Sequence, residues 1–165
     1  IITDSGSFRY PSTTAQTFAT AARLVEAGAQ PNAIHERLFD ANPMSRLKTF
    51  GHGLSGAQIA AQGRAVVLSL SLEDLEQAGY VAGDSEGLVN WGLSVEGVEV
   101  SVLLREDAAG LIKMSFRSKG DRDVNEFARA HFAGGGHRNA AGGASTQTLA
   151  ETKAQLISLL EPWLA

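Results

Sequence analysis

The chain has 165 residues, 44% hydrophobic and 19% charged, which is the composition of a globular protein with one core or two small ones. Its net charge of −4 argues against a protein that coats long nucleic acids by bulk electrostatics. Cysteine is absent, which excludes disulfides and thiolate metal sites, and the apolar runs are too short for a membrane span, so we expect a cytoplasmic protein.

The first 43 residues are predicted to form the last part of one domain. Residues 1–3 indicate the end of a buried strand, and residues 4–7 indicate a turn at its carboxyl end, where α/β sheets place their ligands. Helices are predicted over residues 13–27, ending at Gly28, and from Pro31 onward. Residues 44–62 read as a connector, helical near 46–48 and then loosened by Gly51, Gly53 and Gly56.

A second domain is predicted over residues 63–165. It begins with a strand over 64–72, whose apolar start suggests burial on both faces, and continues with short helices over 75–81 and 86–91. Alternating apolar residues over 98–104 predict an amphipathic strand, and a turn over 106–110 leads to a strand over 111–118. In that last strand Met114 and Phe116 share one face, and Arg117 lies on the other.

Two further helices complete this domain. Asp123 and Glu126 form a capping-box pattern that opens the first, and Thr148 and Glu151 form a second such pattern near the end of the chain. The predicted fold class is therefore α/β, with a mixed β-sheet flanked by helices.

Residues 134–143, with the sequence GGGHRNAAGG, are the most informative segment. Glycines reach positive φ without steric cost, and their amides, together with the N-terminus of a following helix, form an anion-binding nest. His137 and Arg138 would add donors and charge. From the residues alone, a tight turn that is rich in glycine for packing reasons is an equally good interpretation.

The local charge around this segment is positive. Residues 117–138 contain five Lys or Arg against three acids, which suits a short anionic ligand on an otherwise acidic protein. Within this stretch, we interpret Arg122 and Arg129 as charges on a solvated helix face.

The glycine segment with His137 resembles the GGGH signature of the DHHA1 domain, the C-terminal half of the DHH phosphoesterases. Residues 2–10 (ITDSGSFRY) resemble the last motif of the DHH catalytic domain, and residues 116–120 (FRSKG) resemble the substrate-contacting strand end of DHHA1. The resemblance covers essentially the whole chain and is closest to the bacterial oligoribonuclease and 3′-phosphoadenosine-5′-phosphate phosphatase subgroup. The family's Asp-His-His triplet is absent from this sequence, so we expect a C-terminal fragment of a longer enzyme. In that fragment, residues 1–43 would be the end of the DHH domain, residues 44–62 a connector, and residues 63–165 the DHHA1 domain.

The resemblance also implies a site. Asp4 would be the last protein ligand of a two-metal Mn²⁺ or Mg²⁺ centre, although on its own an aspartate before Ser-Gly-Ser is more often a turn residue. His137 would contact the substrate, with a structural histidine as the other interpretation. The full set of implied substrate-binding residues is Arg117, Ser118, Gly135, Gly136, His137, Arg138 and Asn139.

The implied function is metal-dependent hydrolysis of short oligoribonucleotides or of 3′-phosphoadenosine 5′-phosphate by the full-length parent. The resemblance also implies that the parent is a homodimer that pairs through its DHH domain. We expect the fragment alone to be inactive. Two alternatives remain, a cyclic or linear dinucleotide phosphodiesterase and a non-catalytic nucleic-acid-binding module. Trp91 would stack on a nucleobase or serve the core or a dimer interface.

Overall fold

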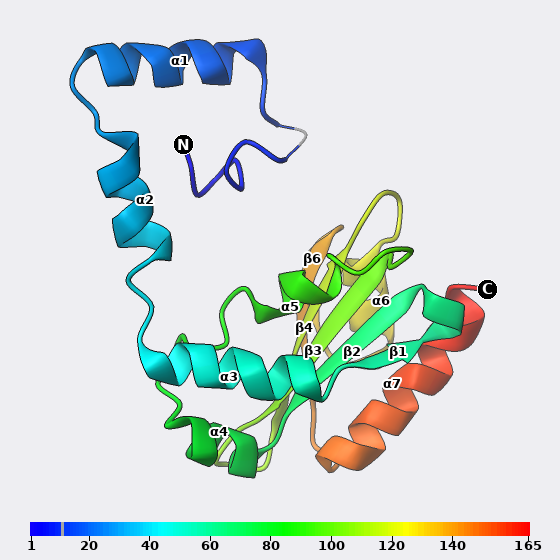
Figure 1. The fold of residues 1–165 in the computed structure, drawn as a ribbon. Coiled ribbons are helices and arrows are strands. Elements are labelled where there is room, and N and C mark those ends of the chain that lie inside the picture. Colours follow the sequence, from blue (N-terminus) through cyan, green and yellow to red (C-terminus); the bar gives the residue numbers. More distant parts are fainter. Residues whose placement is uncertain (11) are drawn as a thin grey trace. The chain divides into compact units, whose positions relative to one another are not determined.

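The computed structural model describes residues 1–10 and 12–165, which form two compact units, Ile1–Asn42 and Pro43–Ala165 (Figure 1). In the described part of the chain, no helix is both long and apolar enough to cross a membrane.

Unit 1 consists of a turn-rich segment followed by two helices, α1 (Ala15–Glu26) and α2 (Pro31–Phe39). Both predicted helices are confirmed. Thr14 caps α1 with a capping box, and Pro31 occupies the first turn of α2, where its missing N–H costs nothing. Neither helix has a buried residue, and Phe18 is 56% exposed.

The predicted strand over residues 1–3 is wrong. The backbone there bonds locally, with the N–H groups of Ser5 and Ser7 donating to the carbonyls of Ile1 and Ile2, so the segment forms tight turns. A strand needs a neighbouring strand to satisfy its backbone groups, and the described residues of unit 1 contain none.

Unit 2 is built on one six-stranded sheet with the order β1-β2-β3-β4-β6-β5. The strands are β1 (Gln58–Ala60), β2 (Ala65–Leu70), β3 (Val100–Glu106), β4 (Ile112–Ser118), β5 (Gly135–His137) and β6 (Ala140–Ser145). β2 and β3 run parallel, while the other neighbours are antiparallel, so the predicted mixed sheet is confirmed.

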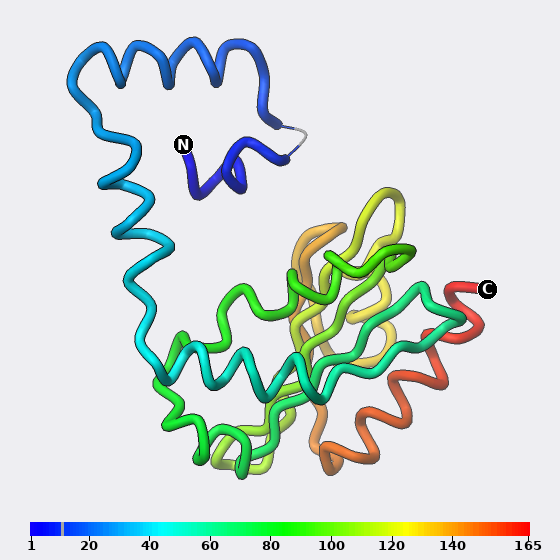
Figure 2. The backbone as a smooth tube through the Cα atoms, in the orientation of Figure 1, coloured from blue at the N-terminus to red at the C-terminus, as the bar shows by residue number. Residues whose placement is uncertain are grey.

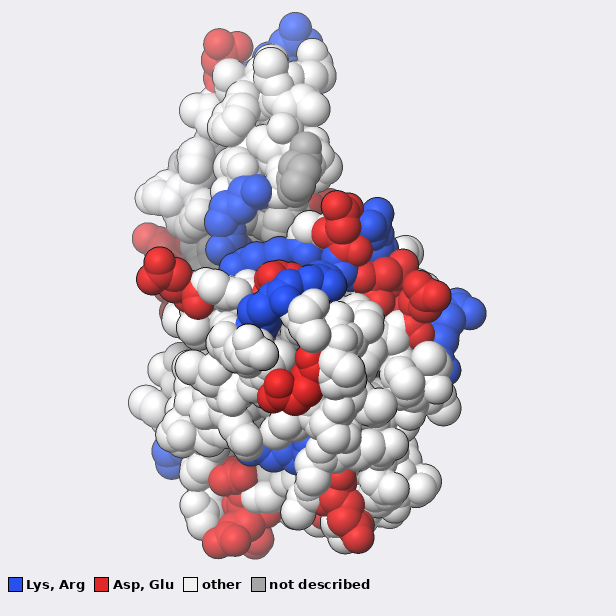
Figure 3. Space-filling view, turned by 90° about the vertical axis from the view of Figure 1, so that its right-hand side faces the viewer, with Lys and Arg blue, Asp and Glu red and all other residues white. Residues whose placement is uncertain are grey.

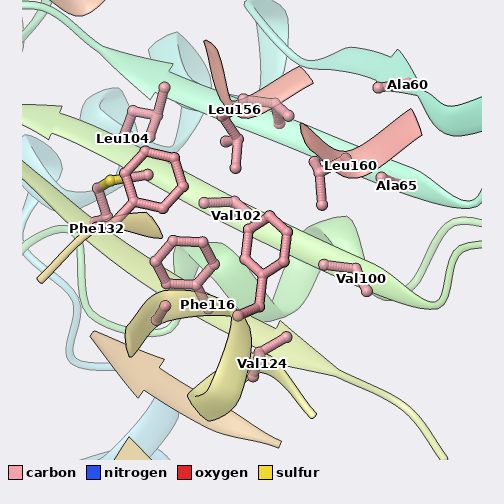
Figure 4. Packing of buried hydrophobic residues seen from close by; sticks show 14 of the residues in the cluster. Ala60, Ala65, Val100, Val102, Leu104, Phe116, Val124, Phe132, Leu156 and Leu160 are labelled. Atoms are coloured by element: carbon pink, nitrogen blue, oxygen red, sulfur yellow. The ribbon is translucent and has the colours of Figure 1, made fainter. Parts of the chain in front are cut away.

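One face of the sheet is covered by α6 (Val124–His131) and α7 (Leu149–Trp163), as Figure 1 shows. Phe116 of β4 is fully buried there and packs with Phe127 and Phe132, close to Leu156 and Leu160 of α7 (Figure 4). The predicted helix starts are confirmed, because Asp123 caps α6 and Thr148 forms a capping box with Glu151 on α7.

On the other face, α3 (Met44–Ser55), α4 (Leu72–Ala78) and α5 (Leu88–Gly92) pack over β2 and β3, and α5 also reaches β4. A short 3₁₀ turn, Ala61–Gly63, joins β1 to β2. Because α5 covers β3, Ser101 and Leu103 are buried as well as the alternating valines, and the prediction of an amphipathic strand is wrong here.

Two predicted boundaries also change. α3 continues through Gly51 and Gly53, where we expected a loosened connector, and a Cβ at Gly53 would lie 2.6 Å from a methyl of Leu88, so this glycine allows α3 to approach α5 closely. α4 starts before the predicted residue 75, because Ser71 forms a capping box with Asp74.

The glycine segment is not followed by a helix, so that part of the predicted anion nest is wrong. It forms the hairpin β5–β6, with residues 138–139 as the connection. Figure 2 shows the chain turning back here, beside the turn near residue 120.

Candidate functional site

The side of β4, β6 and β5 opposite α6 and α7, which we call the open face, brings sequence-distant residues together. β4 pairs with β6 and β6 pairs with β5, so that Arg117 lies opposite Ala140, and Ala140 lies opposite His137. Paired residues in antiparallel strands project to the same side of a sheet. Arg117 and His137 therefore share one face, about 10 Å apart at their Cα atoms, which is two interstrand spacings.

A second row crosses the same strands next to the first. Ser115 pairs with Gly142, and Gly142 pairs with Gly135. The open face thus carries small side chains in its middle, because period two sends the large residues Met114 and Phe116 to the covered face, where both are buried.

A pocket of about 630 Å³ extends over the open face toward the segment that precedes α5. Three cations line it, Arg105, Lys113 and Arg117, against one carboxylate, Glu86. This volume lies in the range of small-molecule sites, and the excess of positive charge favours an anionic ligand.

Each of these cations contacts a neighbour, and Arg117 Nη1 donates to the Phe116 carbonyl over 2.8 Å. The guanidinium of Arg105 lies 5.3 Å from the centroid of the Tyr80 ring, and Lys113 Nζ lies 3.4 Å from Asp107. The backbone N–H of Leu111, followed by smaller contributions from Ala109 and Lys113, lowers the pKa of Asp107, so this carboxylate stays ionised beside Lys113. The turn between β3 and β4 therefore fixes one end of the pocket.

Ser118 and Asn139 lie away from the open face. Ser118 is only 8% exposed, and its hydroxyl donates to the Arg122 carbonyl over 2.6 Å. Asn139 Nδ2 donates to Ser118 Oγ and to the Gly120 carbonyl. Their polar groups hold the turn after β4, next to Arg117.

His137 is exposed at the end of β5, and Arg138 follows it in the hairpin turn. Arg138 Nη2 donates to both the carbonyl and the Oδ1 of Asp121, each over 3.0 Å. Arg138 thereby joins the hairpin turn to the turn after β4, and the open face keeps its shape across β4, β6 and β5.

The glycines of the segment serve different purposes. A Cβ at Gly136, whose φ is +155°, would lie 2.5 Å from the Ala140 carbonyl, and one at Gly134 would meet the carbonyl of Gly142. The N–H of Gly136 donates to Asn125 Oδ1 over 2.9 Å. These two glycines therefore allow β5 to pack closely, and the Gly136 amide already has a protein partner.

Arg129 is a residue that sequence reasoning set aside. Its Nε donates to Asn125 Oδ1 over 3.0 Å, and its guanidinium lies 3.7–3.8 Å from the position a Cβ would take at Gly135. The helical i, i+4 spacing of residues 125 and 129 was a signal available in the sequence. Arg129 thus adds a cation at the edge of the glycine strand.

Arg122, in contrast, has a structural contact. Arg122 and Arg64 both donate to the carboxylate of Glu99, over 2.8 and 2.9 Å, and hydrogen bonds from Arg64 and Arg122 lower the pKa of Glu99 to about 2. On the face that Figure 3 shows, Lys and Arg side chains lie next to Asp and Glu side chains.

Trp91 is not among the residues that line the pocket, and Asp4 belongs to unit 1. Trp91 is 57% exposed on α5 and packs edge-on against Phe50, with 6.5 Å between the ring centroids. Asp4 is an exposed turn residue of unit 1. Among the described residues, no group of three or more His, Cys, Asp or Glu side chains is placed to hold a metal ion, so Asp4 with its described neighbours does not make a metal site.

Comparisons with known proteins show what this chain is similar to. Residues 58–165 match the DHHA1 domain family. The chain is 31% identical, over 93% of its length, to a probable bifunctional oligoribonuclease and PAP phosphatase NrnA of Streptococcus mutans, and 35% identical, over 86%, to the bifunctional oligoribonuclease and PAP phosphatase NrnA of Thermus thermophilus. It covers 48% and 41% of those proteins, so it spans about half the length of these relatives or less.

Solved structures extend the comparison. An exopolyphosphatase-related protein from Bacteroides fragilis superposes with a TM-score of 0.90 at 34% identity, over 99% of this chain and 48% of that one. A pGpG-specific phosphodiesterase from Vibrio, at 14% identity and a TM-score of 0.51 over 72% of this chain and 38% of its own, shares the fold alone.

Proposed function

Because the chain belongs to the DHHA1 domain family, we propose that its open face binds the nucleotide of a short oligoribonucleotide or of 3′-phosphoadenosine 5′-phosphate for a metal-dependent phosphoesterase. The NrnA relatives carry both substrates in their names, as oligoribonucleases and PAP phosphatases. The proposal transfers those substrates to this chain.

One observation carries the proposal. Arg117 and His137 come from strands separated by β6, yet they share one exposed side of the sheet. A guanidinium presents a planar fork that fits two phosphate oxygens, and an imidazole N–H beside it donates a further hydrogen bond. The two side chains together would hold one phosphate group at this end of the open face.

The remaining assigned residues support this pair. Ser118, Asn139 and Arg138 hold the two turns beside Arg117 and His137. Gly136 allows β5 to lie close to β6, because a Cβ there would meet the Ala140 carbonyl, and Gly135 leaves its position on β5 without a side chain.

The hydrolytic step belongs to the proposal for the full-length enzyme. There, Asp4 would supply one carboxylate to a Mn²⁺ or Mg²⁺ centre, whose chemistry is activation of the water that attacks phosphorus. We propose that the whole enzyme is a cytoplasmic homodimer. The chain described here would bind nucleotide and hydrolyse none, since one carboxylate does not hold a divalent ion tightly.

The test is calorimetric or NMR titration of this chain, without metal, with a two-nucleotide RNA and with 3′-phosphoadenosine 5′-phosphate. We expect both to bind, and Arg117→Ala and His137→Ala to lose binding. Lys153→Ala is the control, because it removes a cation from α7 on the covered face. Equal affinity of the wild type and the three variants would contradict the roles assigned to Arg117 and His137. Tighter binding of long RNA than of the dinucleotide would favour a nucleic-acid-binding module.

A further inference from the structure

Gly142, in the centre of the open face, is a glycine that the fold does not require. Its φ is not positive, and a Cβ built on it would find its nearest neighbour, the Met114 carbonyl, at an ordinary 3.7 Å. At Gly143, the next residue, a Cβ would lie 3.1–3.2 Å from Phe132 and Phe116 of the core. Glycine inside a strand weakens it, so folding alone would favour a side chain at residue 142.

The surroundings of Gly142 form an elongated part of the pocket. Arg117 lies toward one end of β4 and Lys113 toward the other, about 13 Å apart by strand rise, with Ser115 and Gly142 between them. On the side toward β3, the apolar side chains of Val89 and Leu103 border the same pocket. The middle of the pocket, at Ser115 and Gly142, is therefore lined by small residues next to an apolar side, with a cation at each end.

We propose that a nucleobase lies flat on the backbone at Gly142, with its phosphate held by Arg117 and His137. This inference rests on the proposed function and extends it to the orientation of the ligand. A planar ring reaches van der Waals contact with a strand only where no Cβ intervenes, and the apolar lining suits a ring face better than the hydroxyls of a ribose. Ser115 Oγ and the Glu86 carboxylate line the same pocket and would bond the polar edge of the ring.

The ring and the phosphate can be tested separately by NMR on the ¹⁵N-labelled chain. We add adenosine 5′-monophosphate or ribose 5-phosphate, which differ only in the base. Both should shift the resonances of His137, whereas only the base-containing ligand should move Gly142 upfield through the ring current. Equal shifts of Gly142 with both ligands would overturn the orientation, and no shift of His137 with either would overturn the proposed function.

Substitutions provide a second test. Gly142→Ala and then Gly142→Val should weaken binding of adenosine 5′-monophosphate progressively, to about tenfold for valine, the size expected for loss of one stacked base. Their affinity for ribose 5-phosphate should change less than twofold, and their thermal midpoints should equal or exceed that of the wild type. Gly51→Ala is the control, because a Cβ there meets nothing within 4 Å and the residue lies on α3. Unchanged binding in Gly142→Val, or a lowered thermal midpoint in Gly142→Ala, would overturn the proposal.

Discussion

The two faces of β4 differ although the same seven residues, Ile112–Ser118, form them. On the covered face Met114 and Phe116 are buried under α6 and α7. On the open face Lys113, Ser115 and Arg117 border a pocket. Neighbouring residues of one strand therefore face a core on one side and a pocket on the other, where we propose that ligand binds, and substitutions should separate the two.

The largest expected effect is on the covered face. Phe116→Ala should lower the free energy of unfolding by about 3–5 kcal/mol, because it removes a fully buried ring that packs against Phe127 and Phe132. Chemical denaturation measures this effect. Ser115→Ala, the adjacent change on the open face, is the control and should stay within about 0.5 kcal/mol. Similar losses for both would remove the distinction between the faces.

Arg117→Ala should have the next largest effect, on binding. We expect nucleotide affinity to fall by about 1.5–3 kcal/mol, the contribution of a hydrogen bond to a charged group. Titration of the variant against a dinucleotide checks this prediction. Arg117→Lys should recover only part of the loss, since lysine keeps the charge without the planar fork. Full recovery by lysine would indicate that charge alone matters.

Thr148→Ala tests the N-terminus of α7, one of the helices on the covered face. The hydroxyl of Thr148 accepts from the N–H of Glu151 and caps α7, so its removal should cost about 1 kcal/mol of unfolding free energy. Thermal or urea denaturation measures this cost. Nucleotide affinity should be unchanged, because α7 lies on the side opposite the pocket. A change in affinity would show that the two faces are coupled.

The smallest effect concerns pH. Hydrogen bonds from Arg64 and Arg122 lower the pKa of Glu99 to about 2 in the folded chain. The ionised carboxylate therefore contributes to the free energy of unfolding above its unfolded pKa near 4.5, and this contribution is lost as pH falls from there toward 2. The carboxylate is 34% exposed, so solvent screening limits the contribution to about 1 kcal/mol or less. Unfolding free energies measured between pH 5 and about 2.5 should fall less steeply in Glu99→Gln than in the wild type. Equal slopes would mean that the network contributes nothing to stability.

Local patterns predicted much of the fold correctly. The capping residues Asp123 and Thr148 mark where helices begin, because their side chains satisfy the first free N–H groups whatever lies nearby. Strand alternation also separates Arg117 from Phe116. The same alternation places Ser118 on the covered side, together with Phe116. The prediction that Ser118 contacts the ligand did not take this into account.

Patterns failed where a residue's environment comes from distant elements. Gly51 and Gly53 suggested a loosened segment, but the packing of α3 on α4 and β2, and of Gly53 on Leu88 of α5, overrides the low helix propensity of glycine. Residues 1–3 look like a strand, yet no strand pairs with them in the described part of unit 1. Leu103 and Ser101 are buried because α5 covers them, which no alternation within β3 reveals.

The sequence by itself determined the mixed α/β class, the starts of α6 and α7, and the side of β4 on which Arg117 lies, because these depend on spacing and capping within short stretches of chain. Only the tertiary structure decided that His137 shares that side with Arg117, since this depends on β6 lying between β4 and β5 and on its pairing register with both. Register between strands is a long-range property, set by packing across the whole sheet.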